Sequence, residues 1–436
     1  MRKIIVAGAG HGGLVAAYHL AKNGYEVIVA EGKKESDMGH DWHDWLDMGA
    51  FDGADIPRPP EDIVCEAENQ SFRNPKGTVE IRMPIREGSI MMDRKELIKY
   101  LISLAREAGV DIRFETEIIA PLTEGREVTG IIVKKKGRLS MLKGDLVIDS
   151  AGMYSPVRSK LPGTFGIDNN INRRSVFHVY RAYFKNLDGT LNDPSYSINA
   201  FHMYRPGIDW LITKPDYVDI LIGKFSQAGN LTRDEVDAAL ASFREVYPFV
   251  GEEIVRGGTF EDIPISRMLP MLVADGYAAI GDAAGMTVPL NGSGIILSMN
   301  AGKILADTVL GIEGKLTRVM LWKYEYTYFN TLGKNLVMID ILKNMFTYIN
   351  GEVVDYLMEK GILNADMLAI PDGHTPSITP DYVKRLVAAL PKAVKHLPAV
   401  TRSLKTMPLA GAVCKNMPET YSEAKVRRWI RAYRAL

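Results

Sequence analysis

Near its start the chain reads Lys3-Ile4-Ile5-Val6-Ala7-Gly8-Ala9-Gly10-His11-Gly12-Gly13, a short apolar run that leads into a glycine-rich turn. The turn has the spacing G-x-G-x-x-G, and residues 14–22 after it are typical of a helix that ends at Asn23-Gly24. A second apolar run over residues 26–30 ends at Glu31. Strand, glycine turn, helix, strand and acid in this order predict a Rossmann-like unit that binds a dinucleotide.

Each position of the glycine turn has a physical role in this prediction. Gly8 permits the tight turn, Gly10 lets a pyrophosphate approach the backbone, and Gly13 lets the helix lie close to the strand. Backbone N–H groups at the helix start then face the anion. Glu31 is placed to accept hydrogen bonds from ribose hydroxyls, which favours FAD or NAD over NADP. The predicted contacts of this unit with the dinucleotide are Gly8, Ala9, Gly10, His11, Gly12, Gly13 and Glu31.

Two later segments distinguish FAD from NAD. Residues 145–152 read Asp-Leu-Val-Ile-Asp-Ser-Ala-Gly and follow a predicted hairpin over residues 128–142. Residues 276–285 read Gly-Tyr-Ala-Ala-Ile-Gly-Asp-Ala-Ala-Gly and lead through Pro289-Leu290-Asn291-Gly292-Ser293-Gly294 into an apolar helix over residues 295–310. With these motifs the chain resembles the FAD-dependent oxidoreductases of the p-hydroxybenzoate hydroxylase fold. The resemblance is greatest to the geranylgeranyl reductase branch, which carries G-D-A-A-G followed by P-L-x-G-x-G-I.

The resemblance covers about residues 1–310 through four motifs, of which Asp93-Arg94 is the fourth. It implies that Asp282 holds the ribityl chain of FAD, that Arg94 contacts the cofactor, and that residues 292–294 lie beside the isoalloxazine. N–H groups at a helix start can stabilise negative charge on reduced flavin there. The cofactor residues that the resemblance adds are Gly32, Arg94, Ile118, Gly152, Asp282, Pro289, Gly292, Ser293 and Gly294.

The expected fold class is α/β: a Rossmann-like FAD-binding domain of the GR2 type, an inserted β-rich substrate domain and a C-terminal helical region. The resemblance implies a discontinuous FAD-binding domain over residues 1–57, 88–163 and 265–312. The substrate domain would comprise residues 58–87 and 164–264. In the second of these ranges, β-branched and aromatic residues indicate strands over residues 175–184, 195–204, 210–213 and 218–225. A helix over residues 233–247, with Thr232 as its N-cap, would interrupt these strands. The helical region would comprise residues 313–436.

Composition excludes several classes of protein. The 53 basic and 53 acidic residues cancel, so overall charge gives no support to nucleic acid as a partner. Cys65 and Cys414, the two cysteines, cannot supply a four-thiolate iron–sulfur cluster. His40 and His43 lie three residues apart without a third ligand cluster, so we expect no metal site. No comparable second G-x-G-x-x-G occurs, so NAD(P)H would dock transiently or a reduced electron-carrier protein would be the donor.

Charge is unevenly distributed along the chain. Residues 381–436 contain twelve Lys or Arg and three Asp or Glu, a net charge of +9. Such a segment is attracted to anionic lipid head groups, and the alternative is a solvated helical face. The longest uncharged run, residues 283–302, contains Pro289, Asn291 and several glycines, which disfavours a membrane-spanning helix. We therefore expect a cytoplasmic protein, with peripheral membrane contact through the basic tail as a further prediction.

Residues 39–47, Gly-His-Asp-Trp-His-Asp-Trp-Leu-Asp, have the most unusual local composition. They follow the acidic end of the second predicted strand, and the resemblance implies that the chain there returns toward the flavin. His43, His40 or a nearby acid would then donate a proton. The alternative is a surface loop with half-buried tryptophans. By analogy Trp210 would line the substrate cavity, or it would simply belong to the core.

Three functions remain open at this point. The first is an FAD-dependent oxidoreductase that saturates C=C bonds in an isoprenoid or other apolar small molecule or lipid, by hydride transfer from reduced flavin. The second is a flavin-dependent monooxygenase that hydroxylates an aromatic or apolar substrate. The third is a non-catalytic prenyl-binding protein, against which the intact glycine turn, Glu31 and Asp282 argue. We expect the first, an enzyme of the geranylgeranyl reductase type.

Overall fold

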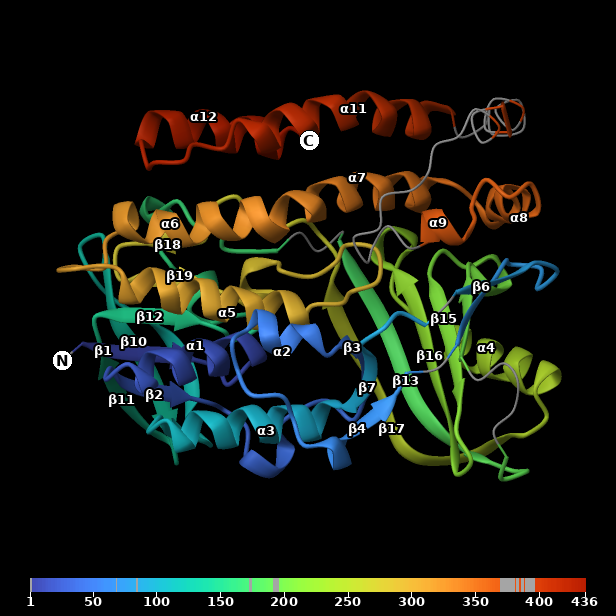
Figure 1. Ribbon diagram of the computed structural model, residues 1–436, viewed down its shortest axis with the longest axis horizontal. Helices are drawn as coiled ribbons and strands as arrows, with labels where there is room; N and C mark the ends of the chain where they lie inside the picture. The colour runs from blue at the N-terminus through green and yellow to red at the C-terminus, as the bar shows by residue number, and fades with distance from the viewer. Residues whose placement is uncertain are drawn as a thin grey trace.

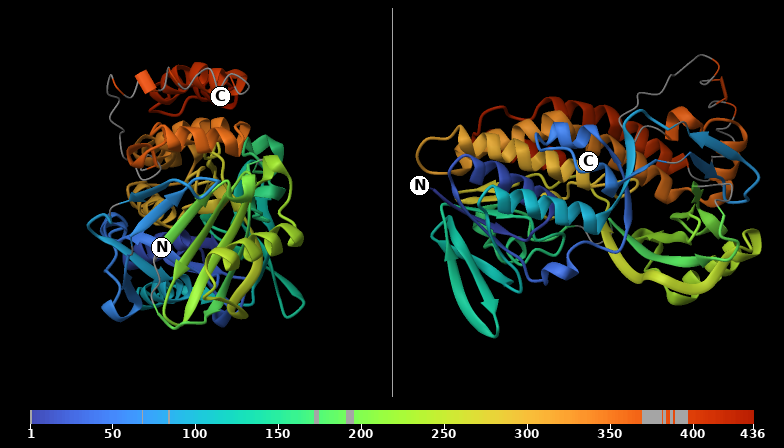
Figure 2. Two further views of the ribbon diagram at one scale, coloured as in Figure 1. Left: turned by 90° about the vertical axis from the view of Figure 1, so that its right-hand side faces the viewer. Right: turned by 60° about the horizontal axis from the view of Figure 1, so that its bottom comes forward.

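Figure 1 shows the architecture of the computed structural model: a Rossmann-like part on the left, a second sheet on the right, and a stack of helices above both. The two further views in Figure 2 show the C-terminal helices as the outermost layer of that stack. The structure describes residues 2–67, 69–83, 85–171, 175–190, 196–368, 381, 384–385, 388 and 397–436. Most of residues 369–396, which include part of the basic tail, thus lie outside the described residues.

The Rossmann-like sheet forms where the sequence predicts it. Its strands are β1 (Lys3–Ala7), β2 (Glu26–Ala30), β8 (Asp111–Arg113), β12 (Leu146–Asp149), β18 (Val273–Ala274) and β19 (Tyr277–Ala279). Among the described residues their order is β18-β19-β12-β1-β2-β8, and all neighbours are parallel except β18 and β19. Residues 4–7 of β1 are fully buried, as expected for a parallel strand covered on both faces.

Helices and a small antiparallel sheet cover the two faces of the Rossmann-like sheet. The helices are α1 (His11–Lys22), α3 (Arg94–Glu107) and α5 (Ile295–Leu310), and α1 packs against both others. The antiparallel sheet consists of β9 (Glu117–Glu124), β10 (Glu127–Lys135) and β11 (Arg138–Lys143), and β10 packs on β12. Asp93 caps α3, because its carboxylate accepts the backbone N–H of Lys95 at 2.7 Å.

The second sheet contains seven strands within the described residues, in the order β17-β13-β16-β15-β14-β5-β6. Their bounds are β5 (Gln70–Arg73), β6 (Glu80–Met83), β13 (Val176–Asn186), β14 (Tyr196–Ala200), β15 (Ile208–Thr213), β16 (Tyr217–Phe225) and β17 (Val250–Pro264). The sequence pattern did not predict β17, which is the longest of these strands. Gly257 and Gly258 interrupt its strand pattern with positive φ angles of 73° and 86°, and the register with β13 shifts there.

Alternation of side chains gives the second sheet two different faces. The outer face packs on α4 (Arg233–Val246), which begins with the predicted cap Thr232 in a capping box with Glu235. The inner face carries an apolar cluster that includes Phe177, Leu221 and Phe225 and also contains Trp42. It faces a small sheet of β3 (His43–Asp47), β7 (Ser89–Asp93) and β4 (Val64–Glu66). In the chain, β3 precedes the short helix α2 (Gly49–Gly53), and β4 and β7 come after it.

The segment over residues 39–47 is therefore not a surface loop along its whole length. From His43 onward it forms β3, which pairs antiparallel with β7. Two side chains of the second sheet hold the first residue of β3. The backbone N–H of His43 donates to the Tyr183 hydroxyl at 2.8 Å, and its carbonyl oxygen accepts Arg181 at 2.8 Å. These partners lie 140 and 138 residues away in the sequence. Local composition therefore could not indicate the strand.

The C-terminal part of the described chain is helical, as predicted. It contains α6 (Arg318–Tyr328), a π-helical turn (Phe329–Gly333), α7 (Lys334–Tyr348), α8 (Gly351–Glu359), α9 (Ala365–Leu368), α11 (Leu397–Lys415) and α12 (Glu423–Arg434). Val426, Trp429, Ile430 and Tyr433 of α12 belong to the same core cluster as β1 and α1. None of the described helices combines the length and the hydropathy that crossing a bilayer requires.

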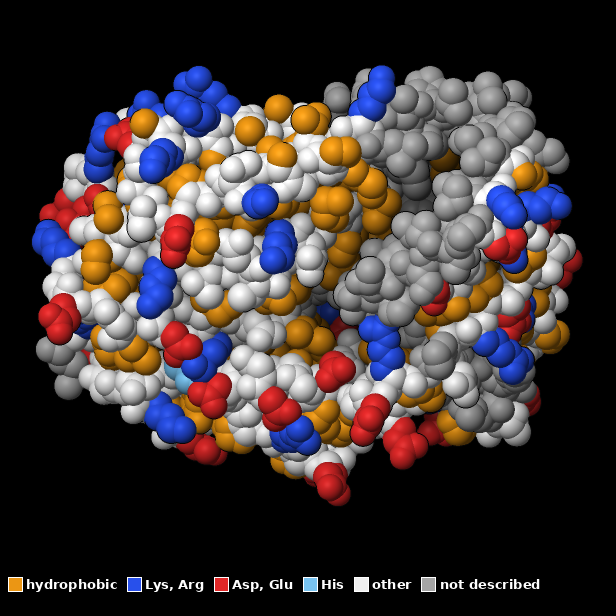
Figure 3. Space-filling view, turned by 45° about the horizontal axis from the view of Figure 1, so that its top comes forward, with side chains coloured by type: hydrophobic (Ala, Val, Ile, Leu, Met, Phe, Trp, Pro, Cys, Tyr) orange, Lys and Arg blue, Asp and Glu red, His pale blue; other side chains and the backbone are white. Residues whose placement is uncertain are grey.

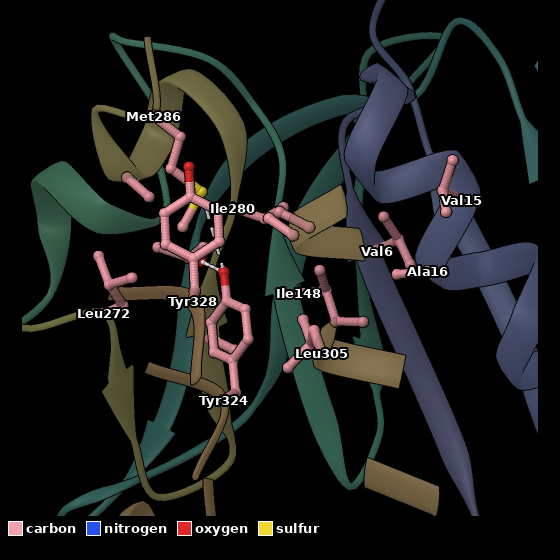
Figure 4. Packing of buried hydrophobic residues seen from close by; sticks show 14 of the residues in the cluster. Val6, Val15, Ala16, Ile148, Leu272, Ile280, Met286, Leu305, Tyr324 and Tyr328 are labelled. Carbon is pink, nitrogen blue, oxygen red and sulfur yellow. Dashed lines mark hydrogen bonds between the residues drawn. The ribbon is translucent and has the colours of Figure 1, made fainter. Parts of the chain in front are cut away.

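Figure 4 shows how α6 closes the core beside the Rossmann-like sheet. Tyr324 and Tyr328 lie near Ile280 and Met286, and the Tyr324 hydroxyl donates to the Ala279 carbonyl oxygen at 2.8 Å. The next residue, Glu325, is fully buried. One of its carboxyl oxygens accepts the Leu272 N–H at 2.8 Å, and the other has no hydrogen-bond partner. Burial raises the pKa of Glu325 to about 8, so this carboxyl is protonated at neutral pH.

We predict that Glu325 makes the stability of the protein fall with rising pH. Its pKa is higher in the folded than in the unfolded chain, so the stabilisation is fully present below about pH 4.5 and is lost as the pH rises through about 8. The loss should be on the order of 4 kcal/mol. In Glu325→Gln the free energy of unfolding, measured in urea from pH 5 to 9, should fall much less. The exposed control Glu245→Gln should keep the wild-type profile, and an unchanged profile in Glu325→Gln would contradict the assignment.

Candidate functional site

Two helix N-termini meet at the carboxyl edge of the Rossmann-like sheet. Helix α1 begins after Gly10 and α5 begins after Gly294, and neither N-cap makes a side-chain hydrogen bond. The helices cross within their first turns: a Cβ on Gly12 would lie 2.3 Å from the Ser298 carbonyl oxygen. The Gly12 N–H donates to Ser298 Oγ at 3.1 Å. The crossing brings the uncapped N–H groups of both helices close together, which creates a place for anionic groups.

The glycine turn also fits closely against the end of β12. Gly8 has a φ of 92°, and a Cβ there would lie 2.6 Å from the Ser150 carbonyl oxygen. A Cβ on Gly13 would lie 2.7 Å from Ser150 Cβ and 3.0 Å from Val6 Cγ1, in agreement with the expected close packing of α1 on the strand. A Cβ on Gly10 would lie 2.6 Å from Ser150 Oγ. The second glycine is thus required by this side chain as well, a contact that the motif did not reveal.

Glu31 lies at the glycine turn, at the opposite end of the candidate site from α5. Its carboxylate accepts the N–H groups of Ala9 and Lys33, both at 2.9 Å. A surface depression beside it is lined by Gly32, Lys33, Lys34, Glu115, Glu117 and Lys134, and Ile118 follows Glu117 on β9. The predicted residues Glu31, Gly32 and Ile118 are therefore neighbours, as a common contact with an adenosine would need.

Asp282 lies at the start of α5. It belongs to the turn η7 (Gly281–Ala284), and a Cβ on Gly294 would lie 3.5 Å from its Oδ1. Burial raises the pKa of Asp282, and the nearby Arg94 and His40 oppose that rise. Within the described part of the chain no group donates a hydrogen bond to this carboxylate, so it can accept bonds from a ligand's hydroxyls. Gly292 packs on β17, where a Cβ would lie 2.8 Å from Ile263 Cγ2.

Two further predicted residues, Arg94 and His11, meet between these ends of the site. Arg94 makes a bidentate ion pair with Asp44, at 2.6 and 2.5 Å, and its guanidinium lies 4.7 Å from the ring centre of Trp42. Nε2 of His11 is shielded from solvent and has no hydrogen-bond partner. Burial, assisted by Arg94, lowers the pKa of His11 to about 4, so this ring is neutral. Sequence analysis did not assign Asp44, although it lies in the segment that was singled out.

These groups fit FAD. The start of α1 suits a pyrophosphate, the start of α5 suits negative charge on the isoalloxazine, the Glu31 and Asp282 carboxylates suit ribose and ribityl hydroxyls, and Nε2 of His11 lacks a partner. The turn of Pro289, Gly292, Ser293 and Gly294 lies at the start of α5, where the Val288 N–H donates to the Ser293 carbonyl oxygen at 2.8 Å. Gly152 follows β12 with a φ of 80° and no described atom within 4 Å of a Cβ built on it.

The inner face of the second sheet carries a buried ion pair beside its apolar cluster. Arg181 donates to both oxygens of Asp219, at 2.8 and 2.5 Å, and both side chains are 2% exposed. The Arg181 guanidinium lies 5.1 to 5.6 Å from the ring centres of Trp210, Trp42 and Tyr183. Nε1 of Trp210 is buried without a hydrogen-bond partner. The charge of Arg181 is thus compensated, and aromatic rings surround it.

The two histidines of the 39–47 segment lie in different surroundings. His40 stacks on Trp42 with ring centres 4.9 Å apart, and its Nδ1 lies 3.5 Å from Glu261 Oε1. The ring of His43 is parallel to that of Tyr217, whose hydroxyl oxygen lies 3.5 Å from Nδ1. On its other side Nε2 lies 3.8 Å from Asp93 Oδ2. Burial lowers the pKa of His43, although the carboxylates of Asp219 and Asp93 oppose that shift.

Comparison with known proteins agrees with this description of the site. The sequence model of the family described as FAD dependent oxidoreductase matches residues 83–308, and that of the NAD(P)-binding Rossmann-like domain matches residues 6–54. Digeranylgeranylglycerophospholipid reductase of Methanocella arvoryzae is 25% identical over 405 residues, which cover 90% of this chain and 97% of the relative. The protein of the same name from Methanospirillum hungatei is 25% identical over 413 residues, covering 92% and 98%.

Solved structures share the fold. A geranylgeranyl bacteriochlorophyll reductase-like protein from Thermoplasma acidophilum has a TM-score of 0.72 at 19% identity, covering 91% of this chain and 98% of its own. A myxobacterial chondrochloren halogenase has a TM-score of 0.62 at 17% identity, covering 100% and 97%. The predicted α/β class, with a Rossmann-like domain, a β-rich sheet and C-terminal helices, is confirmed. The family models and the geometry of the site together confirm FAD as the cofactor.

We predict that Gly12→Ala disrupts both the helix crossing and the cofactor site. The added methyl group would overlap the Ser298 backbone, which should cost roughly 2 to 3 kcal/mol and push the helix starts apart. Thermal unfolding and retention of FAD through gel filtration measure the two effects. The control is Gly411→Ala in α11, where a Cβ meets nothing within 4 Å. This control should be neutral or slightly stabilising, and a wild-type yield of bound FAD in Gly12→Ala would refute the prediction.

Proposed function

The chain belongs to the FAD dependent oxidoreductase family and is an FAD-dependent enzyme, and from this premise we propose that it reduces C=C bonds of an isoprenoid lipid. The observation that carries the proposal is the apolar inner face of the second sheet, which adjoins the cofactor residues. Trp42 belongs to that face and also contacts Arg94, while Gly292 packs on Ile263 of the same apolar cluster. A substrate between face and cofactor would be largely removed from water, as hydride transfer requires.

The names of the two archaeal relatives support the substrate class, because both are called digeranylgeranylglycerophospholipid reductase. We also propose the division into domains given above; the pairing of β5 with β14 supports the inclusion of residues 58–87 in the substrate domain. NAD(P)H or a reduced carrier protein would supply electrons from outside. Of the cofactor residues, we assign Glu31 to the ribose, Asp282 to the ribityl chain, and Gly292, Ser293 and Gly294 to the isoalloxazine.

Reduced FAD supplies the hydride, and a proton must reach the other alkene carbon. We assign this proton to His43, whose Nδ1 contacts the Tyr217 hydroxyl on the wall of the apolar face. Nε2 of His43 is on the side of Asp93, which is partly exposed and paired with Arg256 at 2.5 Å. Protons can therefore enter at Nε2 and leave from Nδ1. Because burial lowers the pKa of His43, its protonated form gives up the proton readily. His40 and Trp210 would line the substrate site.

The reaction is tested by anaerobic reoxidation of the protein after reduction with dithionite. Addition of digeranylgeranylglycerophospholipid in detergent should restore the oxidised flavin spectrum, and mass spectrometry should detect the saturated lipid. The matched control lipid, already fully saturated, should leave the flavin reduced. If only oxygen reoxidises the protein, the reductase assignment fails and a monooxygenase reaction replaces it.

The same assay tests His43. The single-turnover rate, measured from pH 5.5 to 8, should decrease with rising pH, because the protonated fraction of His43 decreases. His43→Gln should lower the rate on the order of 100-fold and remove this dependence. The variant His40→Gln is the control and should keep the pH profile. A wild-type profile in His43→Gln would assign the proton to another group.

We further propose that α12 contacts a membrane surface from which the substrate is taken. Its inner side is buried in the core, whereas Lys425, Arg428 and Arg431 are exposed. Figure 3 shows Lys and Arg side chains gathered over α12 and hydrophobic side chains over the neighbouring α11. One of the latter, Leu409, is 61% exposed. Cations beside exposed apolar side chains favour binding to an anionic lipid interface.

Vesicle sedimentation tests the membrane contact. The triple variant Lys425→Glu, Arg428→Glu, Arg431→Glu should lose binding to vesicles that contain anionic phospholipid, since each cation near such a surface contributes about 1 kcal/mol. The control carries the same charge change at the exposed turn between β10 and β11: Lys135→Glu, Lys136→Glu, Arg138→Glu. This turn lies far from α12 in Figure 1. Equal binding by both variants and the wild type would exclude the proposed surface.

A further inference from the structure

One peptide unit, between Met268 and Leu269, is hydrogen-bonded on both of its sides. Its carbonyl oxygen accepts the hydroxyl of Tyr433, in α12, at 2.8 Å. Its N–H donates to the Ala284 carbonyl oxygen at 2.9 Å. A peptide unit is planar and rigid, so the direction of its carbonyl fixes the direction of its N–H. Tyr433 thereby orients the donor that holds Ala284, and hydrogen bonds in such a chain strengthen one another.

Ala284 is the last residue of η7, the turn that carries Asp282. Two backbone hydrogen bonds close this turn: the Gly285 N–H donates to the Asp282 carbonyl oxygen at 3.2 Å, and the Met286 N–H donates to that of Gly281 at 3.0 Å. On its far side Gly281 touches α5, because a Cβ there would lie 2.7 Å from Ser298 Oγ. The bond to Ala284 therefore fixes η7 from the side opposite to the helix crossing, and with it the place of the Asp282 carboxylate.

Tyr433 itself is held rigidly. Its side chain is 2% exposed, and its ring lies 5.0 Å from Trp429 and 6.1 Å from Phe329 in the π-helical turn. The Arg267 guanidinium lies 5.1 Å from the ring centre of Tyr433. Arg267 directly precedes Met268, whose carbonyl oxygen accepts the Tyr433 hydroxyl. Arg267 also pairs with Asp340 of α7 at 3.5 Å. Burial raises the pKa of Tyr433 well above that of a free tyrosine, so the hydroxyl keeps its proton and remains a donor.

The ion pair extends the same support to the end of β17. Lys343 of α7, which is fully buried, donates to Asp340 at 2.8 Å and to the Ile265 carbonyl oxygen at 2.6 Å. The segment over residues 265–269 is thus fastened to α7 and α12 together, while its Leu269 N–H holds the cofactor turn. Ile265 also belongs to the apolar cluster on the inner face of the second sheet, so the Lys343 hydrogen bond joins this support to the edge of that cluster.

We propose that α12 contributes to the binding of FAD and that Tyr433 is a positioning residue for Asp282. The C-terminal helix, more than 120 residues beyond the last cofactor motif, sets the turn through the Met268–Leu269 peptide. Loss of the Tyr433 hydroxyl frees this peptide to rotate, and the binding of FAD must then order the turn as well. This inference concerns cofactor affinity and does not depend on which substrate is reduced.

Tyr433→Phe tests the proposal against Trp429→Phe, a matched control on the same helix. Each substitution removes one hydrogen bond to a backbone carbonyl; that of Trp429 goes to Val413, in α11, at 2.9 Å. Tyr433→Phe should weaken FAD binding by the full-length apoprotein between about threefold and tenfold. It should also alter the visible circular dichroism of bound FAD. Trp429→Phe should leave the dissociation constant within about twofold, even if both variants lower the melting temperature equally.

A second pair of variants keeps the test decisive if Tyr433→Phe does not fold. Arg267→Gln removes the charge beside Tyr433 and should weaken FAD binding in the same direction, whereas Arg267→Lys should restore most of the affinity and the dichroism. The proposal is overturned if Tyr433→Phe and Trp429→Phe have the same effect on FAD affinity. It is also overturned if Arg267→Gln binds FAD like the wild type. Neither result would bear on alkene reduction, which the anaerobic assay measures separately.

Discussion

The contact between Gly12 of α1 and Ser298 of α5 is the constraint on which the rest of the structure depends. Only hydrogen side chains at Gly12 and Gly302 permit it, since a Cβ on Gly302 would lie 2.4 Å from the Gly12 carbonyl oxygen. The crossing places two uncapped helix starts side by side. The favourable field of both N-termini is then concentrated on one anionic ligand. Glu31, Asp282 and the glycine turn are the groups that we propose to bind FAD beside this crossing.

Two buried arginines around the site are paired within the protein. Arg94 is matched by Asp44 and Arg181 by Asp219, each with two short hydrogen bonds. Burial would raise the pKa of Asp44, but the Arg94 guanidinium outweighs it and lowers that pKa. Ion pairs of this kind contribute little net stability, yet removing one partner leaves an unpaired charge in the interior. Their effect here is to place compensated charges at fixed positions beside the apolar cluster of the second sheet.

The two roles that we propose for the basic tail share one helix. Its net charge suggested a solvated or lipid-facing segment, and the outer side of α12 agrees with that description. The inner side, however, packs Val426, Trp429 and Tyr433 into the main core. Deleting the tail would therefore unfold part of the core as well as remove charge. Lipid contact and cofactor support can be separated only by changing the outward or the inward side chains individually.

The sequence by itself determined the dinucleotide-binding unit over residues 3–31 and the start of α4, because both depend on local signals, and FAD followed from the resemblance that the later motifs carry. Glycine spacing at residues 8–13, strand and helix periodicity, and the cap Thr232 act over a few residues. Tertiary structure decided the rest. It made His43 the start of a strand, paired Arg94 with Asp44, joined Gly12 to Ser298 and brought Tyr433 to Met268, across 50, 286 and 165 residues for the last three. Contacts between such distant residues depend on how the complete chain packs, so no short stretch of sequence carries a signal for them.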